Sequence, residues 1–117
     1  MPHIHLETTA NLQENDSIPD ILEELVSILS AQETVAADSI KSYHTLRHTW
    51  AMGGGAPLGF VHCTVALLSG RPLELRQAIS SAIGDYLKER FAESLGSSEA
   101  GLTVELREMN RETYYKV

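Results

Sequence analysis

The stretch Met1-Pro2-His3-Ile4-His5-Leu6-Glu7 opens the chain, and the interpretation of the remaining sequence depends on it. Its apolar residues Ile4 and Leu6 alternate with polar ones, a period of two that predicts a half-buried strand over residues 2–8. An initiator methionine is commonly removed before a small residue such as proline, which would leave a free secondary amine on Pro2. A strand beginning this close to the terminus would hold that amine inside a sheet instead of leaving it to fray.

A free amine at this place has a definite chemistry. The ordinary pKa of an amino-terminal amine is about 7.7–8.0, and it is the only backbone group that titrates near neutrality. Partial burial disfavours the charged form and lowers the pKa further. The result would be a general base or a nucleophile that needs no side chain. The plain alternative is that Pro2 merely follows the initiator methionine, and only the rest of the chain can distinguish the two.

The composition indicates one globular domain over residues 1–117. The net charge is −7 and no cluster of Lys or Arg occurs, so nucleic acid is not an expected partner. No apolar run reaches the ~18 residues of a membrane span, and Glu7 in the opening strand argues against a signal peptide. Cys63 is the only cysteine, which excludes an internal disulfide and suits a reducing compartment. We expect a cytoplasmic protein without a membrane partner.

Hydrophobic periodicity predicts two helices and three further strands. In the first helix Ser17 is a candidate N-cap and Pro19 lies in the first turn, while Pro72 lies near the first residue of the second helix. The segment after the last strand carries Tyr114 and Tyr115, which suit packing on a neighbour. The expected elements are a strand over 2–8, a polar connection over 10–16, a helix over about 18–30, an extended segment over 40–52, a loop at 53–57, a strand over 59–68, a helix over about 71–91, a loop at 96–98 and a strand over 102–107.

The order strand-helix-strand occurs twice, in halves of about 1–56 and 57–117. Residues 57 positions apart match in several places. The matching pairs are Ile4 and Val61, His5 and His62, Leu6 and Cys63, and Leu22 and Ile79, and by the same spacing Gly59 takes the place of Pro2. Two such units, each with one apolar face, must pack side by side into one four-stranded sheet covered by two helices, an α/β (α+β) fold. Because helices on one face leave the other face uncovered, we also expect oligomerisation.

An amino-terminal proline on a strand, followed by two strand-helix-strand units, resembles the tautomerase superfamily. Within it the chain is most similar to the 5-carboxymethyl-2-hydroxymuconate delta-isomerase family. The resemblance spans nearly the whole chain and is carried by an ordered set of motifs: Met1-Pro2-His3-Ile4, Ile40 and Ser42 with Thr49-Trp50-x-Met52-x-x-Gly55, Phe60-Val61-His62-x-Thr64, and Gly70-Arg71-x-Leu73-Glu74-x-Arg76-Gln77. It implies a tautomerase-like fold and a homotrimer with sites near subunit boundaries.

The same resemblance implies a cofactor-independent isomerase of aromatic-compound catabolism, in homoprotocatechuate degradation. Pro2 would be the general base that moves a proton in an unsaturated 2-hydroxy or 2-keto acid. The expected substrate is an unsaturated dicarboxylate or tricarboxylate, with 5-carboxymethyl-2-hydroxymuconate as first candidate. Arginines would bind its carboxylates, and Arg71 matches one of the family arginines.

The chain departs from the family pattern in one stretch. Where the family has Ile-Arg-Ser-Arg, this sequence has Ile40-Lys41-Ser42-Tyr43. Lys41 keeps the positive charge without the planar guanidinium that binds a carboxylate through two bonds, and Tyr43 keeps only a donor. Arg47 is the next candidate, because in a regular strand it lies on the same side as Lys41 and Tyr43. This departure weakens the substrate assignment more than it weakens proline chemistry.

Several alternatives stay open. The chain could bind a small anion or act in assembly without isomerase activity, or Pro2 could serve hydration, dehalogenation or decarboxylation. Arg71 could be a plain surface arginine at a helix start. The five histidines suggest a metal site, but no metal-ligand spacing is present, so we expect none. We interpret His62 as a hydrogen-bonded core histidine and Cys63 as a small buried hydrophobic residue.

Overall fold

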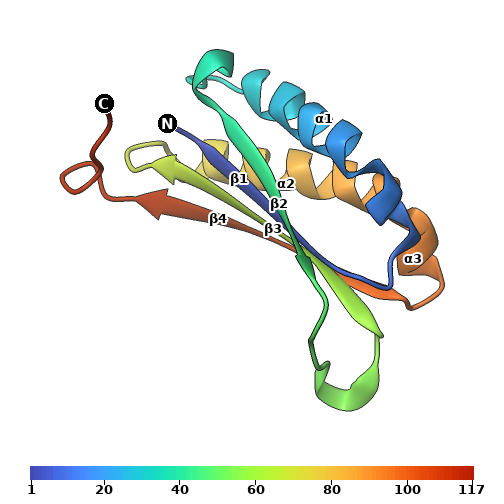
Figure 1. Cartoon of the computed structure of the whole chain (residues 1–117). Helices are drawn as coiled ribbons and strands as arrows, with labels where there is room; N and C mark the ends of the chain where they lie inside the picture. Colours follow the sequence, from blue (N-terminus) through green and yellow to red (C-terminus); the bar gives the residue numbers. More distant parts are fainter.

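In the computed structural model, which describes residues 1–117, the chain forms a four-stranded mixed sheet in the order β2-β1-β3-β4 (Figure 1). Strands β1 (His3–Thr9) and β2 (Lys41–Arg47) are parallel, and so are β3 (Gly59–Leu68) and β4 (Ala100–Met109). At the centre, β1 and β3 are antiparallel. The sheet therefore consists of two strand-helix-strand units that meet between β1 and β3.

Two long helices, α1 (Ile18–Ser30) and α2 (Leu73–Arg90), connect the strands of each unit and cover one face of the sheet (Figure 1). Ser17 occupies the predicted N-cap position of α1, but its side chain makes no capping hydrogen bond. Pro72 is the N-cap of α2 instead of one of its first helical residues. A short helix, α3 (Ala92–Gly96), follows α2 where the sequence predicts no further helix. None of these helices combines the length and apolar character needed to cross a membrane.

Most predicted boundaries hold within two residues, and β3 has the predicted limits. The predicted extended segment 40–52 is too long, because β2 ends at Arg47 where its partner β1 ends at Thr9. Strand β4 is longer than predicted, since it pairs with β3 along its whole length. The connections between the main elements contain three short 3-10 turns, η1 (Gln13–Ser17), η2 (Ala37–Ser39) and η3 (Gly53–Gly55).

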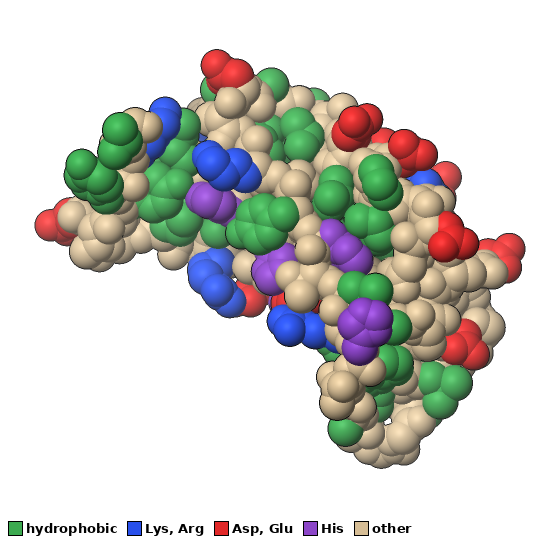
Figure 2. All heavy atoms as spheres, in the orientation of Figure 1, with side chains coloured by type: hydrophobic (Ala, Val, Ile, Leu, Met, Phe, Trp, Pro, Cys, Tyr) green, Lys and Arg blue, Asp and Glu red, His purple; other side chains and the backbone are tan.

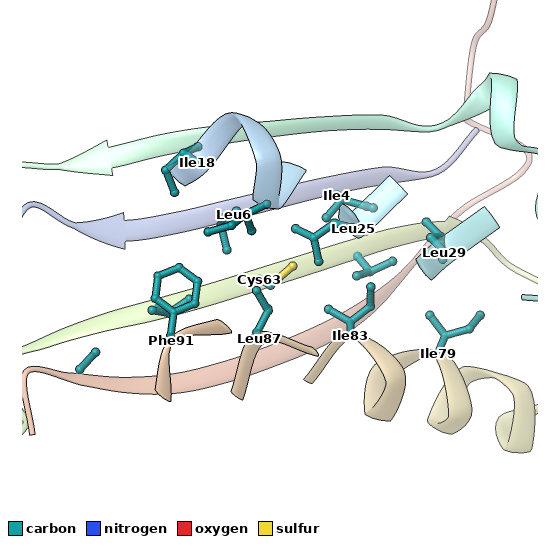
Figure 3. Close-up of a cluster of buried hydrophobic side chains, with 14 of the residues drawn as sticks. Ile4, Leu6, Ile18, Leu25, Leu29, Cys63, Ile79, Ile83, Leu87 and Phe91 are labelled. Carbon is teal, nitrogen blue, oxygen red and sulfur yellow. The ribbon is translucent and has the colours of Figure 1, made fainter. Parts of the chain in front are cut away.

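The hydrophobic core lies between the sheet and the two helices (Figure 3). Alternate residues of β1 and β3 point into it, as the predicted period of two requires. Cys63 is buried among these residues, as expected from the sequence. Burial raises the pKa of its thiol to about 12, so the thiol stays protonated and behaves as a small hydrophobic group. The central core residues are Ile4, Leu6, Val61, Cys63 and Val65 from the strands, and Ile21, Leu25, Leu29, Ile79, Ile83 and Leu87 from the helices.

The two halves repeat with one shift. Buried strand residues match at the predicted spacing of 57, but buried helix residues match at 58: Ile21 with Ile79, Leu25 with Ile83, and Leu29 with Leu87. The predicted pairing of Leu22 with Ile79 is therefore wrong by one residue, and Leu22 is only half-buried. Gly59 stands where the first half has Pro2, and it is tightly enclosed. A Cβ atom there would lie 2.2 Å from Thr9 Oγ1.

The opposite face of the sheet carries no helix (Figure 1). Polar and aromatic side chains cover it, and Figure 2 shows histidines and basic side chains gathered over the strands. The outward residues are Lys41, Tyr43, Thr45 and Arg47 of β2; His3, His5 and Glu7 of β1; His62, Thr64 and Ala66 of β3; and Thr103, Glu105 and Arg107 of β4.

Candidate active site

Strand register brings four segments of the chain to one corner of the sheet. Because β1 and β3 are antiparallel, the start of β1 lies beside the end of β3, and His3 pairs with Ala66. The start of β2 lies on the other side, where the Lys41 N–H donates to the Pro2 carbonyl at 3.0 Å. Strand β4 ends opposite Leu68. The beginning of the chain therefore meets the turn before α2, the start of β2 and the segment after β4.

Pro2 is buried at this corner, whereas Met1, which carries the amine in the structure, is half-buried. Burial is the main cause that lowers the pKa of this amine below its ordinary value of 8.0. Neighbouring positive charges lower the pKa further, because like charges disfavour the ammonium form. These charges belong to Arg71, Lys116, Lys41 and Arg111.

The four cations at this corner have no acidic partner. Four other arginines form ion pairs with glutamates: Arg47, Arg76, Arg90 and Arg107. None of the corner cations does so, although the chain carries 16 Asp and Glu residues against 9 Lys and Arg. An acidic surface lies elsewhere, between α1 and α2. A hollow of about 560 Å³ there is lined by Asp20, Glu23, Glu24, Ser27 and Arg90. An anionic ligand is therefore favoured at the corner and repelled at the larger hollow.

Arg71 is fixed in place and is not a freely solvated surface residue. Its Nε donates to Thr34 Oγ1 at 3.0 Å and its Nη2 to the Thr34 carbonyl at 3.0 Å. Its Nη1 donates to the Leu68 carbonyl at 3.1 Å. Thr34 has a φ of 68°, in the left-handed region, which shapes the connection after α1 so that both of its oxygens face this guanidinium.

Lys41 and Tyr43 lie on the uncovered face, as the strand alternation predicts. The Tyr43 ring stacks on His5 with a centroid distance of 5.0 Å and meets the edge of His3 at 6.3 Å. Burial, with smaller effects from Lys41 and the amine, lowers the pKa of His3. His3 Nε2 and the Tyr114 hydroxyl are 2.9 Å apart and share a hydrogen bond.

Arg47 lies on the same face but at the other end of β2. It is six strand positions from Lys41, roughly 20 Å. Its Nε and Nη2 donate to one carboxylate oxygen of Glu7, at 3.0 Å and 2.6 Å. This hydrogen bonding is the main reason that the pKa of Glu7 is low. The structure therefore brings Pro2, Lys41, Tyr43 and Arg71 to one end of the sheet but does not bring Arg47 there.

A shallow depression of about 250 Å³ continues from this corner across the uncovered face. Its walls are mixed in character, with aromatic and imidazole rings, hydroxyls and one guanidinium, which suits a flat, conjugated and charged molecule. The lining residues are His3, His5, Glu7, Tyr43, His62, Thr64, Ala66 and Arg107.

Four of the five histidines are hydrogen-bonded to hydroxyl groups. Besides His3, these bonds join His5 to Thr45 at 2.8 Å, His44 to Thr8 at 2.7 Å and His62 to Thr103 at 2.6 Å. His62 is hydrogen-bonded as expected, but the interpretation as a core residue is wrong, because it lies half-buried on the uncovered face. No three His, Cys, Asp or Glu side chains converge in an arrangement that could hold a metal ion.

Comparison with known proteins agrees with this geometry. The sequence model of the 5-carboxymethyl-2-hydroxymuconate isomerase family matches residues 2–117. The chain belongs to this family. A 5-carboxymethyl-2-hydroxymuconate Delta-isomerase of Escherichia coli is 27% identical over 117 residues, which cover 99% of this chain and 93% of that protein.

Solved structures of this isomerase family and of related proteins share the fold. A 5-carboxymethyl-2-hydroxymuconate isomerase from Deinococcus radiodurans R1 has a TM-score of 0.91 at 25% identity, covering 99% of this chain and 88% of its own. A second 5-carboxymethyl-2-hydroxymuconate delta-isomerase has a TM-score of 0.81 at 14% identity. The match covers 100% of this chain and 87% of the other. A fused 4-OT symmetric trimer has a TM-score of 0.73 at 17% identity. The match covers 98% of this chain and 90% of the other. The chain therefore has the tautomerase-like fold.

Two cations of this corner, Arg111 and Lys116, were not predicted from the sequence, and Tyr114 was predicted only to pack on a neighbour. All three follow β4. Tyr114 bonds to His3 at the other end of the chain, whereas Arg111 bonds to Ser69 in the turn before α2. Nothing in the local spacing of residues 110–117 signals this contact. The signal lies in the pairing of β3 with β4, which ends with Leu68 opposite Met109 and directs the following residues toward Pro2.

Proposed function

We propose that this chain is a cofactor-independent isomerase that moves a proton in an unsaturated 2-hydroxy or 2-keto acid, with 5-carboxymethyl-2-hydroxymuconate as the first candidate substrate. Pro2, freed by removal of Met1, is the general base. The observation that carries the proposal is the corner itself: a buried proline at the start of a strand, beside four cations that have no acidic partner.

The proposed base acts in its neutral form, and a lowered pKa increases the fraction of the amine that is neutral. Removal of Met1 places the amine on Pro2, deeper in the sheet than the Met1 amine. Burial and the surrounding positive charges then keep its pKa below the ordinary value. The neutral amine takes a proton from the enol oxygen or from a carbon of the substrate and returns one to another carbon of the conjugated chain. One proton leaves and one is added, so no oxidant or reductant is needed.

The cations bind the substrate and stabilise the intermediate charge. Arg71 and Lys41 attract the substrate carboxylates and the dienolate that forms when the base accepts the proton. Tyr43 supplies a hydroxyl donor and an aromatic surface next to the depression. Arg71 precedes α2, where free backbone N–H groups and the helix dipole also favour an anion.

The proposed assembly is a homotrimer in which subunits meet over the uncovered face. Within one chain the corner is open to solvent, so a neighbouring subunit would complete its walls. Arg47 is too far from Pro2 of its own chain, and we assign it to a substrate only across a subunit boundary. The likeness to a fused 4-OT symmetric trimer supports this arrangement through the shared fold.

An ultraviolet time course tests the proposal. The protein, with its amino terminus verified by mass, is mixed with 5-carboxymethyl-2-hydroxymuconate, and the loss of the conjugated-enol absorption is followed. Protein that retains Met1 has no free amine on Pro2 and should be slower by about 10²-fold or more, the usual contribution of a positioned general base. Pro2→Ala, which replaces the secondary amine by a primary one, should also lower the rate. The matched control is Pro19→Ala in the exposed first turn of α1, which should leave the rate unchanged.

Four outcomes can be distinguished. A wild-type rate in protein that retains Met1 would show that the Pro2 amine is not the base, and a wild-type rate in Pro2→Ala would show that the secondary amine of proline is not required. Turnover of other unsaturated acids by the wild type, lost in Pro2→Ala, would keep the proline chemistry and change the substrate. Saturable binding of the acid without turnover would indicate an anion-binding protein on the tautomerase-like fold.

A further inference from the structure

We propose that Arg111 is a second carboxylate-binding arginine of the candidate active site and that it selects ligands with more than one carboxylate. The segment 110–117 that carries it then forms one wall of the site. The inference rests on the proposed function, because it adds a residue to the site defined by Pro2 and Arg71. It concerns binding, however, and can be tested without turnover.

The first observation is that the segment 110–117 folds back onto the start of the chain. The Asn110 side-chain oxygen accepts the Glu112 N–H at 2.9 Å, and the Asn110 carbonyl accepts the Thr113 N–H at 3.2 Å, which forms a turn directly after β4. Tyr114 then bonds to His3 and packs its ring edgewise at a centroid distance of 6.2 Å. Figure 1 shows the two ends of the chain at the same side of the molecule.

The second observation is that two arginines bracket a single turn. Arg111 Nε donates to the Ser69 carbonyl, and Arg71 Nη1 donates to the Leu68 carbonyl next to it. Gly70 follows with a φ of 121°, and a Cβ atom there would lie 3.7 Å from Arg111 Nε. The Arg111 guanidinium therefore lies over the turn that leads into Arg71.

The third observation is the number of unused donors. A guanidinium has five N–H donors. Arg71 makes three hydrogen bonds to protein oxygens, whereas Arg111 makes one. Neither forms an ion pair. Arg111 therefore keeps more donors for a ligand, including both of its Nη groups, and a planar fork of this kind binds a carboxylate through two bonds. It supplies the geometry that Lys41 and Tyr43 lack.

Calorimetric titration with two matched dienes tests the inference. trans,trans-Muconate and sorbate share a six-carbon conjugated chain, but muconate has two carboxylates and sorbate has one. The wild type should bind muconate more tightly than sorbate. Arg111→Ala should weaken muconate binding by about ten- to hundredfold, the loss expected for charged hydrogen bonds, and leave sorbate binding unchanged. Arg111→Lys should be intermediate, since it keeps the charge without the fork.

Two further variants separate binding from structure and from net charge. Arg111→Gln keeps an N–H donor for the Ser69 carbonyl but removes the charge, so it should behave like Arg111→Ala if the role is carboxylate binding. Lys88→Gln removes the same charge near the other end of α2, roughly 20 Å away, and should bind both ligands like the wild type. Urea unfolding of each variant verifies that the fold is intact.

These experiments test the role of Arg111 and the proposed isomerase function separately. An Arg111→Ala protein that keeps the wild-type preference for muconate overturns the inference, and so does a wild type that shows no preference. A wild type without isomerase activity, whose muconate preference is nevertheless lost in Arg111→Ala, would refute the proposed function and support the assignment of Arg111.

Discussion

Lys41 and Tyr43 stand where family resemblance implies arginines, yet the corner around Pro2 is still strongly positive. Arg71, Arg111 and Lys116 supply charges from other segments of the chain, so the field on the amine does not depend on one stretch of sequence. The residues that resemblance could assign were those in recognisable motifs, Pro2 and Arg71. Arg111 and Lys116 could not be assigned, because their position depends on how the segment after β4 folds back onto the start of the chain and onto the turn before α2.

The pH dependence of turnover follows from these charges. The proposed base acts only when neutral, so kcat/KM should fall as the pH drops through the pKa of the amine. For the Met1 amine in the structure, burial and the neighbouring cations lower the pKa below the ordinary value of 8.0. Lys41→Gln removes a like charge and should raise the pKa, which moves the ascending limb of the pH profile to higher pH. The profile is measured as kcat/KM between pH 5 and 9, a range of about two units on either side of neutrality.

Lys88→Gln is the control for this pH profile, because it removes an equal charge far from the amine. Its ascending limb should coincide with that of the wild type. An unchanged limb in Lys41→Gln, or an equal shift in both variants, would contradict a local electrostatic effect on the amine.

At the scale of elements, a buried carboxylate joins the two halves of the molecule. Glu14, in the 3-10 turn η1, accepts the Ser94 N–H at 3.3 Å and the Ser94 hydroxyl at 2.5 Å in α3. Both side chains are less than a tenth exposed. Hydrophobic periodicity located α1, α2 and the strands, but η1 and α3 carry too few apolar residues for such a signal. This polar contact and backbone turns hold them instead.

Replacement of Glu14 should therefore destabilise the fold. Glu14→Ala leaves two buried donors of Ser94 without an acceptor, which should lower the free energy of unfolding by about 1–3 kcal/mol. Glu14→Gln keeps an acceptor oxygen and should cost less. Urea unfolding measures both, with Glu89→Ala at an exposed position of α2 as control. Equal midpoints for Glu14→Ala and the wild type would show that the contact contributes nothing.

At the scale of the whole molecule, one face of the sheet carries no helix, and this is the face that we propose for association between chains. Helices occupy only one side of the sheet, a consequence of connections that cross on the same side in both halves. The sequence predicted this layering, because each strand-helix-strand unit has one apolar face to bury. It could not predict which outward side chains meet, since that depends on the register between β1 and β3.

Assembly through this face is testable with one residue. Light scattering coupled to size exclusion should give a mass three times that of the 12.9 kDa chain. Ala66→Arg places a long charged side chain in the depression on the uncovered face and should reduce the mass to that of a single chain. Ala78→Arg, the same change at an exposed position of α2, should keep the larger mass. If Ala66→Arg keeps the mass of three chains, the interface lies elsewhere.

The enclosed Gly59 limits what this duplicated architecture can do. The second half repeats the shape of the first, but its counterpart of Pro2 is an internal residue, with its nitrogen in a peptide bond and no room for a side chain beside Thr9. Substitution of Gly59 by proline would not create a second free amine, because the nitrogen stays in a peptide bond and the ring would clash with Thr9 Oγ1. Whatever chemistry Pro2 performs is therefore available once per chain, and the second half is left to support it.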